Sequence, residues 1–256
     1  MINTRIIPVL LVDNSRLVKT TKFKSKNYIG DPINAIKVFS NKFVDEIIVI
    51  DISAKRNKKI NYKLIQGMAE ECFSPLTYGG GINSIEQAAK LFKIGVEKIC
   101  INSLLRDDLK KVKELVRLYG SSSIISSIDI YKIRNSYYLY FYDRFIKINP
   151  FKKEIWGYLK HIEGCGVGEI FINFVNKDGT FLGYDFEFIK LLSKKLSLPV
   201  TVCGGCSNFD ELYKLSKYSK ISGIAAGSVF VYRSKNKGVL INYPDIEDIE
   251  KKIGIK

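Results

Sequence analysis

The chain has 256 residues, of which 46% are hydrophobic, enough for the core of one large α/β barrel or of two small domains. Its formal net charge is +15, from 41 Lys and Arg against 26 Asp and Glu, a balance that suits an anionic ligand or a nucleic acid. No apolar run reaches the ~18 residues that a membrane-spanning helix needs, which excludes an integral protein of that type.

The lysines are scattered along the chain, with no long basic block and no basic motif interleaved with aromatic residues. This pattern favours a solvated lysine-rich surface over a nucleic-acid-binding face, and we expect neither a nucleic acid nor a membrane as partner. Arg5 and Pro8 interrupt any signal-peptide pattern before the first strand. We therefore expect a cytoplasmic protein with reduced cysteines.

Eight short β-rich runs follow one another along the chain. The first, 5–12, predicts a strand followed by a loop, with Arg5, Ile7, Val9 and Leu11 on one face because side chains alternate. The other runs lie at 46–51, 75–80, 98–102, 122–129, 169–173, 199–205 and 223–227.

Helical patterns lie between most of these runs. Examples are 84–95, with Ser84 at the N-cap position and Glu86 close behind, and 210–220. Eight β units that alternate with helices predict a single parallel (β/α)8 barrel over residues 1–256. A doubly wound open sheet is the alternative, but it does not predict the internal repeat described next.

Three pairs of segments repeat at an offset of about half the chain. The pairs are 75–81 with 199–205, 45–51 with 168–174, and 98–105 with 223–230. The repeat predicts two duplicated half-barrels, at about 1–122 and 123–240. One long aromatic segment, 129–156, predicts a hairpin-like excursion with an inserted loop at about 130–150, either an active-site cover or a surface hairpin.

The sequence "CGGC" at 203–206 has a spacing that occurs in metal and redox sites. No second motif of this kind accompanies it, and the chain has a single histidine, His161. We therefore predict no metal site and no cofactor.

Glycines that directly follow strands allow a phosphate to approach backbone N–H groups. Two such sites are predicted half a barrel apart, which indicates a ligand with a phosphate at each end. The first combines Gly80 and Gly81 with Asn102 and Ser103. The second consists of Asp178, Gly179, Gly204, Gly205, Gly227 and Ser228.

Charged residues mark both ends of the predicted strands. Asp51, Asp129 and Asp178 follow strands, where a carboxylate transfers protons or binds hydroxyl groups, although a single aspartate there also serves as a helix cap. At the opposite ends, strands begin with Arg5, Glu46, Lys98 and Glu169. These four residues predict either a ring of salt bridges that closes the barrel floor or a gated opening.

Over essentially its whole length the chain resembles the cyclase subunit of imidazole glycerol phosphate synthase. The resemblance is carried by segments such as "RIIPVLLVDNSRLVK", "DEIIVIDISA", "YGGGI", "GEIFINFVNKDGT" and "AAGSVF". It implies a half-repeated barrel that binds a bis-phosphate substrate and pairs with a glutaminase docked at the barrel floor. It also implies that ammonia enters through a charged gate, whose four positions Arg5, Glu46, Lys98 and Glu169 match.

At the carboxyl ends of the strands, where the resemblance places the catalytic residues, the chain matches the family only in part. It implies two acid–base aspartates, of which Asp129 matches the second, whereas Leu11 stands at the first position and cannot transfer a proton. Asp13 is a weak substitute, because it lies about 7 Å further along the strand at ~3.3 Å per residue. Lys19 matches a retained lysine, and we expect it to bind ligand together with Asp51. Asn176 stands where the family has a further acid.

A side branch of the family is more similar still, through "VKTTKFK", "YIGDPINA", "ECFSPLTYGGGI" and "VLINYP". It implies a second copy of the cyclase that works with a glutaminase-like partner and supplies ammonia to an amidotransferase acting on a bacterial surface sugar. We therefore expect an ammonia-conducting subunit of a glutamine-dependent complex. The alternatives are a genuine cyclase of histidine biosynthesis and a non-catalytic scaffold that activates the glutaminase.

Overall fold

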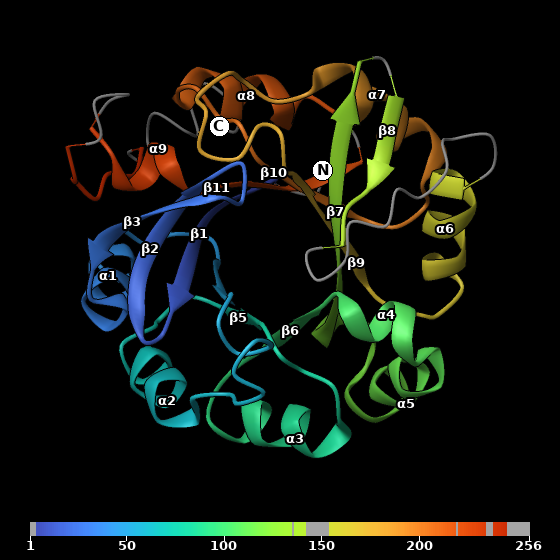
Figure 1. Ribbon diagram of the computed structural model, residues 1–256, viewed down its shortest axis with the longest axis horizontal. Coiled ribbons are helices and arrows are strands. Elements are labelled where there is room, and N and C mark those ends of the chain that lie inside the picture. Colours follow the sequence, from blue (N-terminus) through green and yellow to red (C-terminus); the bar gives the residue numbers. More distant parts are fainter. Residues whose placement is uncertain (1–3, 135, 142–153, 219, 234–237, 245–256) are drawn as a thin grey trace.

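The computed structural model describes residues 4–134, 136–141, 154–218, 220–233 and 238–244. These residues form a closed ring of eight parallel strands with helices outside it, as Figure 1 shows. The first and last strands of the ring pair directly, from Arg5 with Gly223 to Pro8 with Ala226. The predicted (β/α)8 barrel is therefore confirmed, and the open sheet is excluded.

All eight predicted β-rich runs overlap a strand of the barrel. The barrel strands are β1 (Arg5–Asp13), β4 (Ile47–Asp51), β5 (Leu76–Gly79), β6 (Lys98–Ile101), β7 (Ile124–Ile133), β9 (Glu169–Phe174), β10 (Val200–Cys203) and β11 (Ile221–Ala226).

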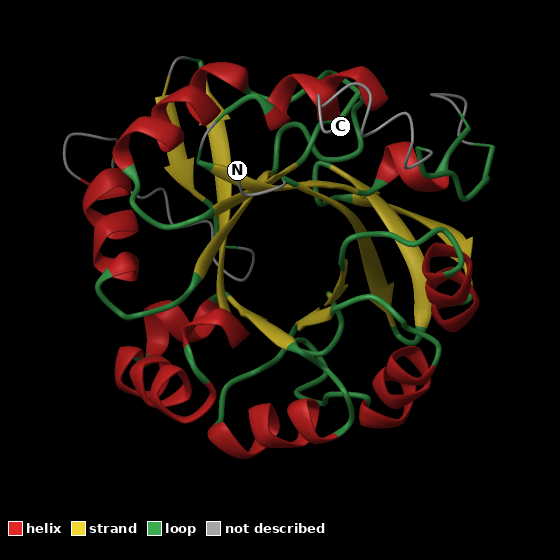
Figure 2. Ribbon diagram, turned by 180° about the vertical axis from the view of Figure 1, so that it is seen from behind, coloured by secondary structure: helices red, strands yellow, loops and turns green. Residues whose placement is uncertain are grey.

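The helices surround the barrel on all sides, which the view from behind in Figure 2 also shows. Their bounds are α1 (Pro32–Ser40), α2 (Tyr62–Glu70), α3 (Ile85–Lys93), α4 (Ser103–Asp107), α5 (Leu109–Tyr119), α6 (Glu154–Glu163), α7 (Phe186–Lys195), α8 (Phe209–Ser216) and α9 (Ser228–Val231), with a 3-10 turn at Ser121–Ser123. Ser84 caps α3 as predicted, because its side chain accepts a hydrogen bond from the Gln87 N–H. Within the described residues, no helix combines the length and apolarity that crossing a membrane requires.

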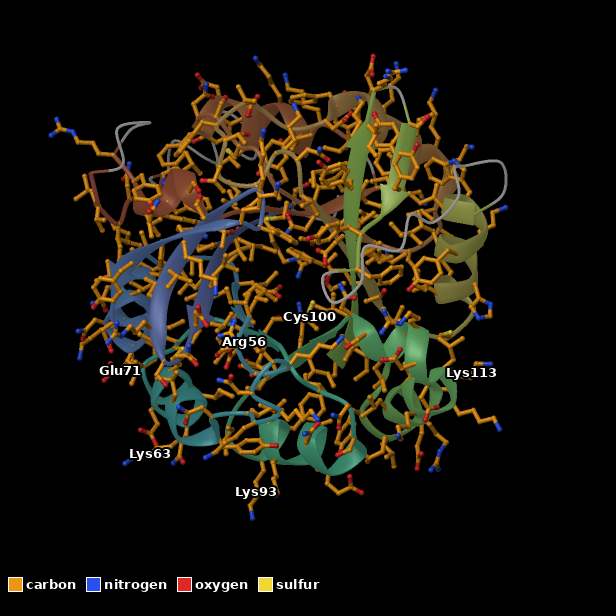
Figure 3. The ribbon with its side chains drawn as sticks, viewed as in Figure 1. Arg56, Lys63, Glu71, Lys93, Cys100 and Lys113 are labelled. Carbon is orange, nitrogen blue, oxygen red and sulfur yellow. The ribbon has the colours of Figure 1, made fainter. Side chains whose placement is uncertain are left out.

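Alternation along the strands divides the buried side chains into two groups. One group fills the layer between barrel and helices, and the other, which includes Ile7, Val9, Ile48 and Phe171, fills the barrel interior. Cys100 belongs to the interior group and lies toward the barrel centre in Figure 3, whereas the lysines labelled there project from the outer helices. Arg5, Ile7, Val9 and Leu11 thus share one face of β1, as predicted.

The predicted loop after the first strand is wrong. Residues Arg16–Thr21 and Ser25–Gly30 instead form strands β2 and β3, which continue the sheet beyond the upper part of β1. The two-residue turn after β1 is left-handed, with φ of 47° and 64° at Asn14 and Ser15, and the three-residue turn after β2 begins with two left-handed residues, with φ of 52° and 60° at Lys22 and Phe23. Such turns match the twist of antiparallel strands, which explains why a polar segment here is ordered.

The aromatic segment after the fifth barrel strand begins with a hairpin. β7 continues past the barrel and pairs in antiparallel fashion with β8 (Ser136–Leu139), from Ile130 with Leu139 to Ile133 with Ser136. The remainder of the predicted insertion, from residue 142, lies outside the described residues. The boundaries of the two half-barrels stay a prediction.

Candidate functional site

A pocket of about 230 Å³ lies at the carboxyl ends of the barrel strands. Its wall includes Leu11, Asp129 and every ligand-binding residue predicted from the sequence. Those residues are Lys19, Asp51, Gly80, Gly81, Asn102, Ser103, Asp178, Gly179, Gly204, Gly205, Gly227 and Ser228. The structure thus brings the predicted set together around one cavity, whereas Asp13 is not part of its wall.

The first glycine turn approaches the neighbouring strand closely. Gly80 and Gly81 have positive φ values of 131° and 69°. A Cβ atom on Gly80 would lie 2.3 Å from the carbonyl oxygen of Asp51, so a side chain does not fit there. Backbone therefore lines the pocket at this point, and backbone N–H groups at such a turn are chemically suited to an anionic group.

The second glycine site contains a buried amine. A Cβ atom on Gly227 would lie 1.8 Å from the Lys19 Nζ, so this amine lies directly against the turn after β11. Lys19 is 4% exposed and donates a hydrogen bond of 2.7 Å to the carbonyl oxygen of Val9. Burial lowers the pKa of Lys19, while the nearby charge of Asp178 acts in the opposite direction.

Asp129 is the acid best placed for proton transfer. Asp129 is half-buried in the pocket wall, and Asn102 donates a hydrogen bond of 3.0 Å to its carboxyl group. Burial raises the pKa of Asp129 to about 7, because the hydrogen bond from Asn102 offsets this effect incompletely and Asp178 adds to it. An acid with such a pKa can take up and release a proton near neutral pH.

The other two pocket acids form structural hydrogen bonds. Asp51 Oδ1 accepts bonds from the Ser53 N–H and hydroxyl at 2.8 and 2.6 Å and thereby shapes the turn after β4. Asp178 Oδ2 accepts bonds from the Thr20 hydroxyl at 2.6 Å and from the Phe23 N–H at 3.3 Å. Burial raises the pKa of Asp178, against the hydrogen bond from Thr20.

Leu11 stands in the pocket wall on the interior face of β1, and the position that the resemblance gives to an acid is therefore apolar. Asp13 lies beyond it and forms ion pairs with Lys26 at 2.6 Å and Arg56 at 2.7 Å. Partial burial would raise the pKa of Asp13, but the hydrogen bonds from Lys26 and Arg56 outweigh it, so the pKa is lowered. This placement does not bring Asp13 to the position of Leu11.

The last two sequence features are Asn176 and the cysteines of the "CGGC" segment, and the side chains of all three residues form contacts within the fold. Asn176 joins the loop after β9 to β7, because its amide group accepts a bond from the Lys132 N–H and donates one of 3.0 Å to the Lys132 carbonyl oxygen. Cys203 and Cys206 are free thiols, and burial raises the pKa of each to about 12. The described residues contain no group of three or more His, Cys, Asp or Glu side chains that could hold a metal ion.

At the opposite end of the barrel, Arg5, Glu46, Lys98 and Glu169 meet as one network, here called the floor ring. Arg5 contacts both carboxylates, with Glu46 bound through Nη1 and Glu169 through Nη2 at 2.6 Å, and Lys98 binds Glu46 at 2.7 Å. The four predicted strand-start residues thus lie together. Their charges sum to zero, and hydrophobic side chains separate them from the pocket.

Two threonines that donate hydrogen bonds to the floor ring were not predicted from the sequence. The Thr77 hydroxyl donates a bond of 2.6 Å to Glu46, and the Thr201 hydroxyl donates a bond to Glu169. Both threonines are buried. They occupy equivalent places in the repeated segments "PLTYGGG" and "PVTVCGG", so the repeat contained the signal that would have identified them.

A family model described as "Histidine biosynthesis protein" matches residues 5–236. The chain belongs to this family. A Pseudomonas aeruginosa protein named "Putative imidazole glycerol phosphate synthase subunit hisF2" is 41% identical over 254 residues, 98% of this chain and 99% of the relative. The Methanocaldococcus jannaschii "Imidazole glycerol phosphate synthase subunit HisF" is 31% identical over 256 residues, 91% of this chain and 92% of the relative.

A Leptospira interrogans relative, named "Putative imidazole glycerol phosphate synthase subunit HisF", is likewise 41% identical over 253 residues, 98% of each chain. The resemblance inferred from the sequence motifs is therefore confirmed. The chain is a barrel subunit of the imidazole glycerol phosphate synthase type, within the histidine biosynthesis protein family.

Proposed function

We propose that this chain is the ammonia-conducting subunit of a glutamine-dependent complex that amidates a bacterial surface sugar, rather than a cyclase of histidine biosynthesis. A glutaminase subunit supplies ammonia at the floor ring. The ammonia passes through the barrel interior to the pocket, where a phosphorylated ligand binds. A sugar amidotransferase then consumes the ammonia.

One observation carries this proposal: the floor ring is complete, whereas the pocket has Leu11 at the position of the first acid. Glu46, Arg5 and Lys98 make direct contacts at the entrance. Across the pocket, Asp129 accepts a hydrogen bond from Asn102, but Leu11 has no acidic proton to complement it. The interior between the two ends is apolar, which favours passage of neutral ammonia over ammonium.

The pocket itself supports binding of a phosphorylated ligand and argues against a purely structural scaffold. The pocket wall combines the glycine turn at Gly80 with the buried amine of Lys19, which lies against Gly227. Backbone N–H groups together with an amine suit an anionic ligand, which a scaffold alone does not require. The expectation is that inorganic phosphate and phosphorylated ligands bind to the isolated barrel.

The decisive experiment compares two reactions of the purified barrel. The barrel is incubated with the bis-phosphate substrate of imidazole glycerol phosphate synthase and ammonium salt, and separately with glutaminase, glutamine carrying a labelled amide nitrogen, and the sugar amidotransferase. We expect label in the sugar and a cyclase rate at least about 100-fold below that of a family member with both acids, because one acid–base partner contributes about 10²–10⁴-fold. Efficient cyclase turnover by the natural sequence would contradict the proposal.

Leu11→Asp and Leu11→Asn form a matched pair for this assay. The two new side chains have nearly the same size, and only the aspartate transfers a proton. A cyclase rate that rises with Leu11→Asp but not with Leu11→Asn would show that the missing acid limits the reaction. Asp129 would serve as the second acid in that variant.

A further inference from the structure

Two phenylalanine side chains lie on the surface at the floor of the barrel. Phe73 is 83% exposed and Phe43 is 77% exposed, the two highest values for large apolar side chains in the part of the chain that the structure describes. Phe43 precedes β4 and Phe73 precedes β5, so both lie at the amino ends of neighbouring strands. Burying large apolar groups is favourable, and such exposure therefore indicates a surface that a partner covers.

Hydrogen bonds hold the two segments together. The buried Ser40 accepts both backbone amides, with its carbonyl oxygen 3.1 Å from the Phe43 nitrogen and its hydroxyl oxygen 3.3 Å from the Phe73 nitrogen. The Ser74 hydroxyl adds a bond of 2.6 Å to the carbonyl oxygen of Val44. Phe43 and Phe73, here called the aromatic pair, are thus presented from one ordered patch, which lowers the entropy cost of binding.

The backbone at Phe43 is unfavourable for its side chain. Its φ is 52°, in the left-handed region that glycine occupies freely and that a bulky residue rarely adopts. An exposed phenylalanine in this conformation contributes nothing visible to the barrel core. Strained positions of this kind occur where a surface serves recognition.

The aromatic pair adjoins the floor ring. Phe43 lies three residues before Glu46, and Phe73 lies four residues before Thr77, whose hydroxyl binds the same glutamate. Arg5 and Lys98 have side chains that are 25% and 21% exposed, so the ring faces solvent on this side. A partner that delivers ammonia here must exclude water around the ring, because ammonia released into water at neutral pH becomes ammonium.

We infer that the aromatic pair is a docking contact for the glutaminase subunit, which receives the two rings in apolar pockets beside its ammonia outlet. This inference rests on the proposed function, which requires an ammonia source at the floor. Buried aromatic side chains surrounded by water-excluding contacts are the usual centres of protein interfaces. Phe73 lies within "ECFSPLTYGGGI", a motif of the side branch, and the contact would therefore select the glutaminase of that branch.

Three variants test the contact in the intact barrel: Phe43→Gly, Phe73→Ser and the two combined. The control is Tyr28→Ser, which removes an exposed aromatic ring, 66% exposed, from β3 at the opposite end of the barrel. Calorimetry measures binding to the purified glutaminase subunit from the same genome. We expect affinity about 10-fold lower for each single variant and at least about 30-fold lower for the double variant, as for interface hot spots, with the control within about 2-fold of the natural sequence.

The melting temperature separates docking from folding. Phe43→Gly removes the left-handed phenylalanine, and we expect this variant to melt at or above the temperature of the natural barrel while it loses affinity. Lower melting temperatures in proportion to the lost affinity would overturn the inference, because they would assign the two rings to the fold.

The remaining outcomes distinguish the two proposals. If the natural barrel binds no glutaminase, the proposed function fails. If it binds and the double variant binds equally well, the docking contact fails and the proposed function stands. If sedimentation shows a dimer of the barrel alone that Phe73→Ser converts to monomers, the aromatic pair contacts a second copy of this chain, and the inference is overturned.

Discussion

The floor of the barrel contains a buried carboxylate and the mouth a half-buried one, and the two have opposite surroundings. At the floor, Glu46 is 1% exposed and receives hydrogen bonds from Arg5, Lys98 and Thr77. At the mouth, the hydrogen bond described for Asp129 comes from the neutral amide of Asn102, and burial raises the pKa of the acid to about 7. Pairing thus makes the floor acid part of the fold, whereas the mouth acid is kept in a state that serves chemistry or ligand binding at the expense of stability.

Removal of the floor acid should have the largest effect. Glu46→Ala leaves Arg5 and Lys98 beside a buried cavity without their shared carboxylate. Breaking a buried pair in this way costs about 3–5 kcal/mol of the free energy of unfolding. Urea denaturation of the purified barrel measures this loss, and a loss below about 1 kcal/mol, typical of exposed pairs, would contradict the comparison.

Removal of the mouth acid should act in the opposite direction. The folded state raises the pKa of Asp129, so the ionised carboxyl group destabilises the fold relative to the protonated one. The free energy of unfolding therefore falls as the pH rises from the pKa of the unfolded state, about 4, to that of the folded state, about 7. Asp129→Asn removes that penalty. We expect its gain in unfolding free energy to be about 3 kcal/mol larger at pH 8 than at pH 5, since one pKa unit corresponds to about 1.4 kcal/mol.

Denaturation curves of the natural barrel and of Asp129→Asn at the two pH values give this difference directly. Asp107→Asn, which removes a 53% exposed carboxylate from α4, is the matched control for loss of one charge. If Asp129→Asn were less stable than the natural barrel at pH 8, the ionised Asp129 would stabilise the fold, as Glu46 does. The proposed difference between the floor and mouth carboxylates would then be wrong.

The threonines of the floor ring should give an intermediate effect. Thr77→Val keeps the shape of the side chain and leaves one oxygen of Glu46 without its hydroxyl donor. An unsatisfied buried acceptor costs about 1–3 kcal/mol, and Thr77→Ser should restore most of it. Thr201→Val, at the equivalent place in the second half, should lose less, because the same oxygen of Glu169 also accepts a hydrogen bond from Arg5. A loss as large as that of Thr77→Val would mean that Arg5 does not compensate for the missing hydroxyl.

The smallest effect is expected for the ion pairs of Asp13, which is not part of the pocket wall. Asp13→Asn weakens exposed pairs with Lys26 and Arg56, each worth about 0.2–1 kcal/mol. Because the pKa of Asp13 is lowered, the stabilisation is present above about pH 4 and disappears as the pH falls through the pKa of the folded state. Phosphate affinity, measured by calorimetry, should stay unchanged, and a clear decrease would assign Asp13 to the site after all.

The sequence was sufficient for those parts of the molecule that depend on periodicity. Alternation along 5–12 predicts the interior face of β1, and strand starts and strand ends predict the floor ring and the pocket wall. The meander of β2 and β3 was missed because Lys19 and Thr20 are polar, and the tertiary contacts that bury them have no local signature. Sequence also cannot show which oxygen of an acid is already occupied, as in Asp51 and Asp178.

The backbone conformation of the exposed aromatic pair could not be predicted from the sequence either. Nothing in "NKFVD" predicts a left-handed phenylalanine, because local preference favours other conformations for that residue. Ser40, at the end of α1, accepts hydrogen bonds from the backbone N–H groups of Phe43 and Phe73, and the second of these bonds joins α1 to the turn before β5. Contacts between distant segments, rather than propensity, decide the conformation there.

The attachment of the β2–β3 turn to Asp178 offers a way to follow the opening of the pocket. The Lys22 N–H donates a bond of 2.9 Å to the Asp178 carbonyl oxygen, and the Phe23 N–H donates one to its carboxylate. These two amide hydrogens exchange with deuterated solvent only when the turn leaves the loop after β9. Their exchange rates therefore report how often the pocket uncovers, in the absence of any substrate, and slower exchange on addition of phosphate would measure closure by a ligand.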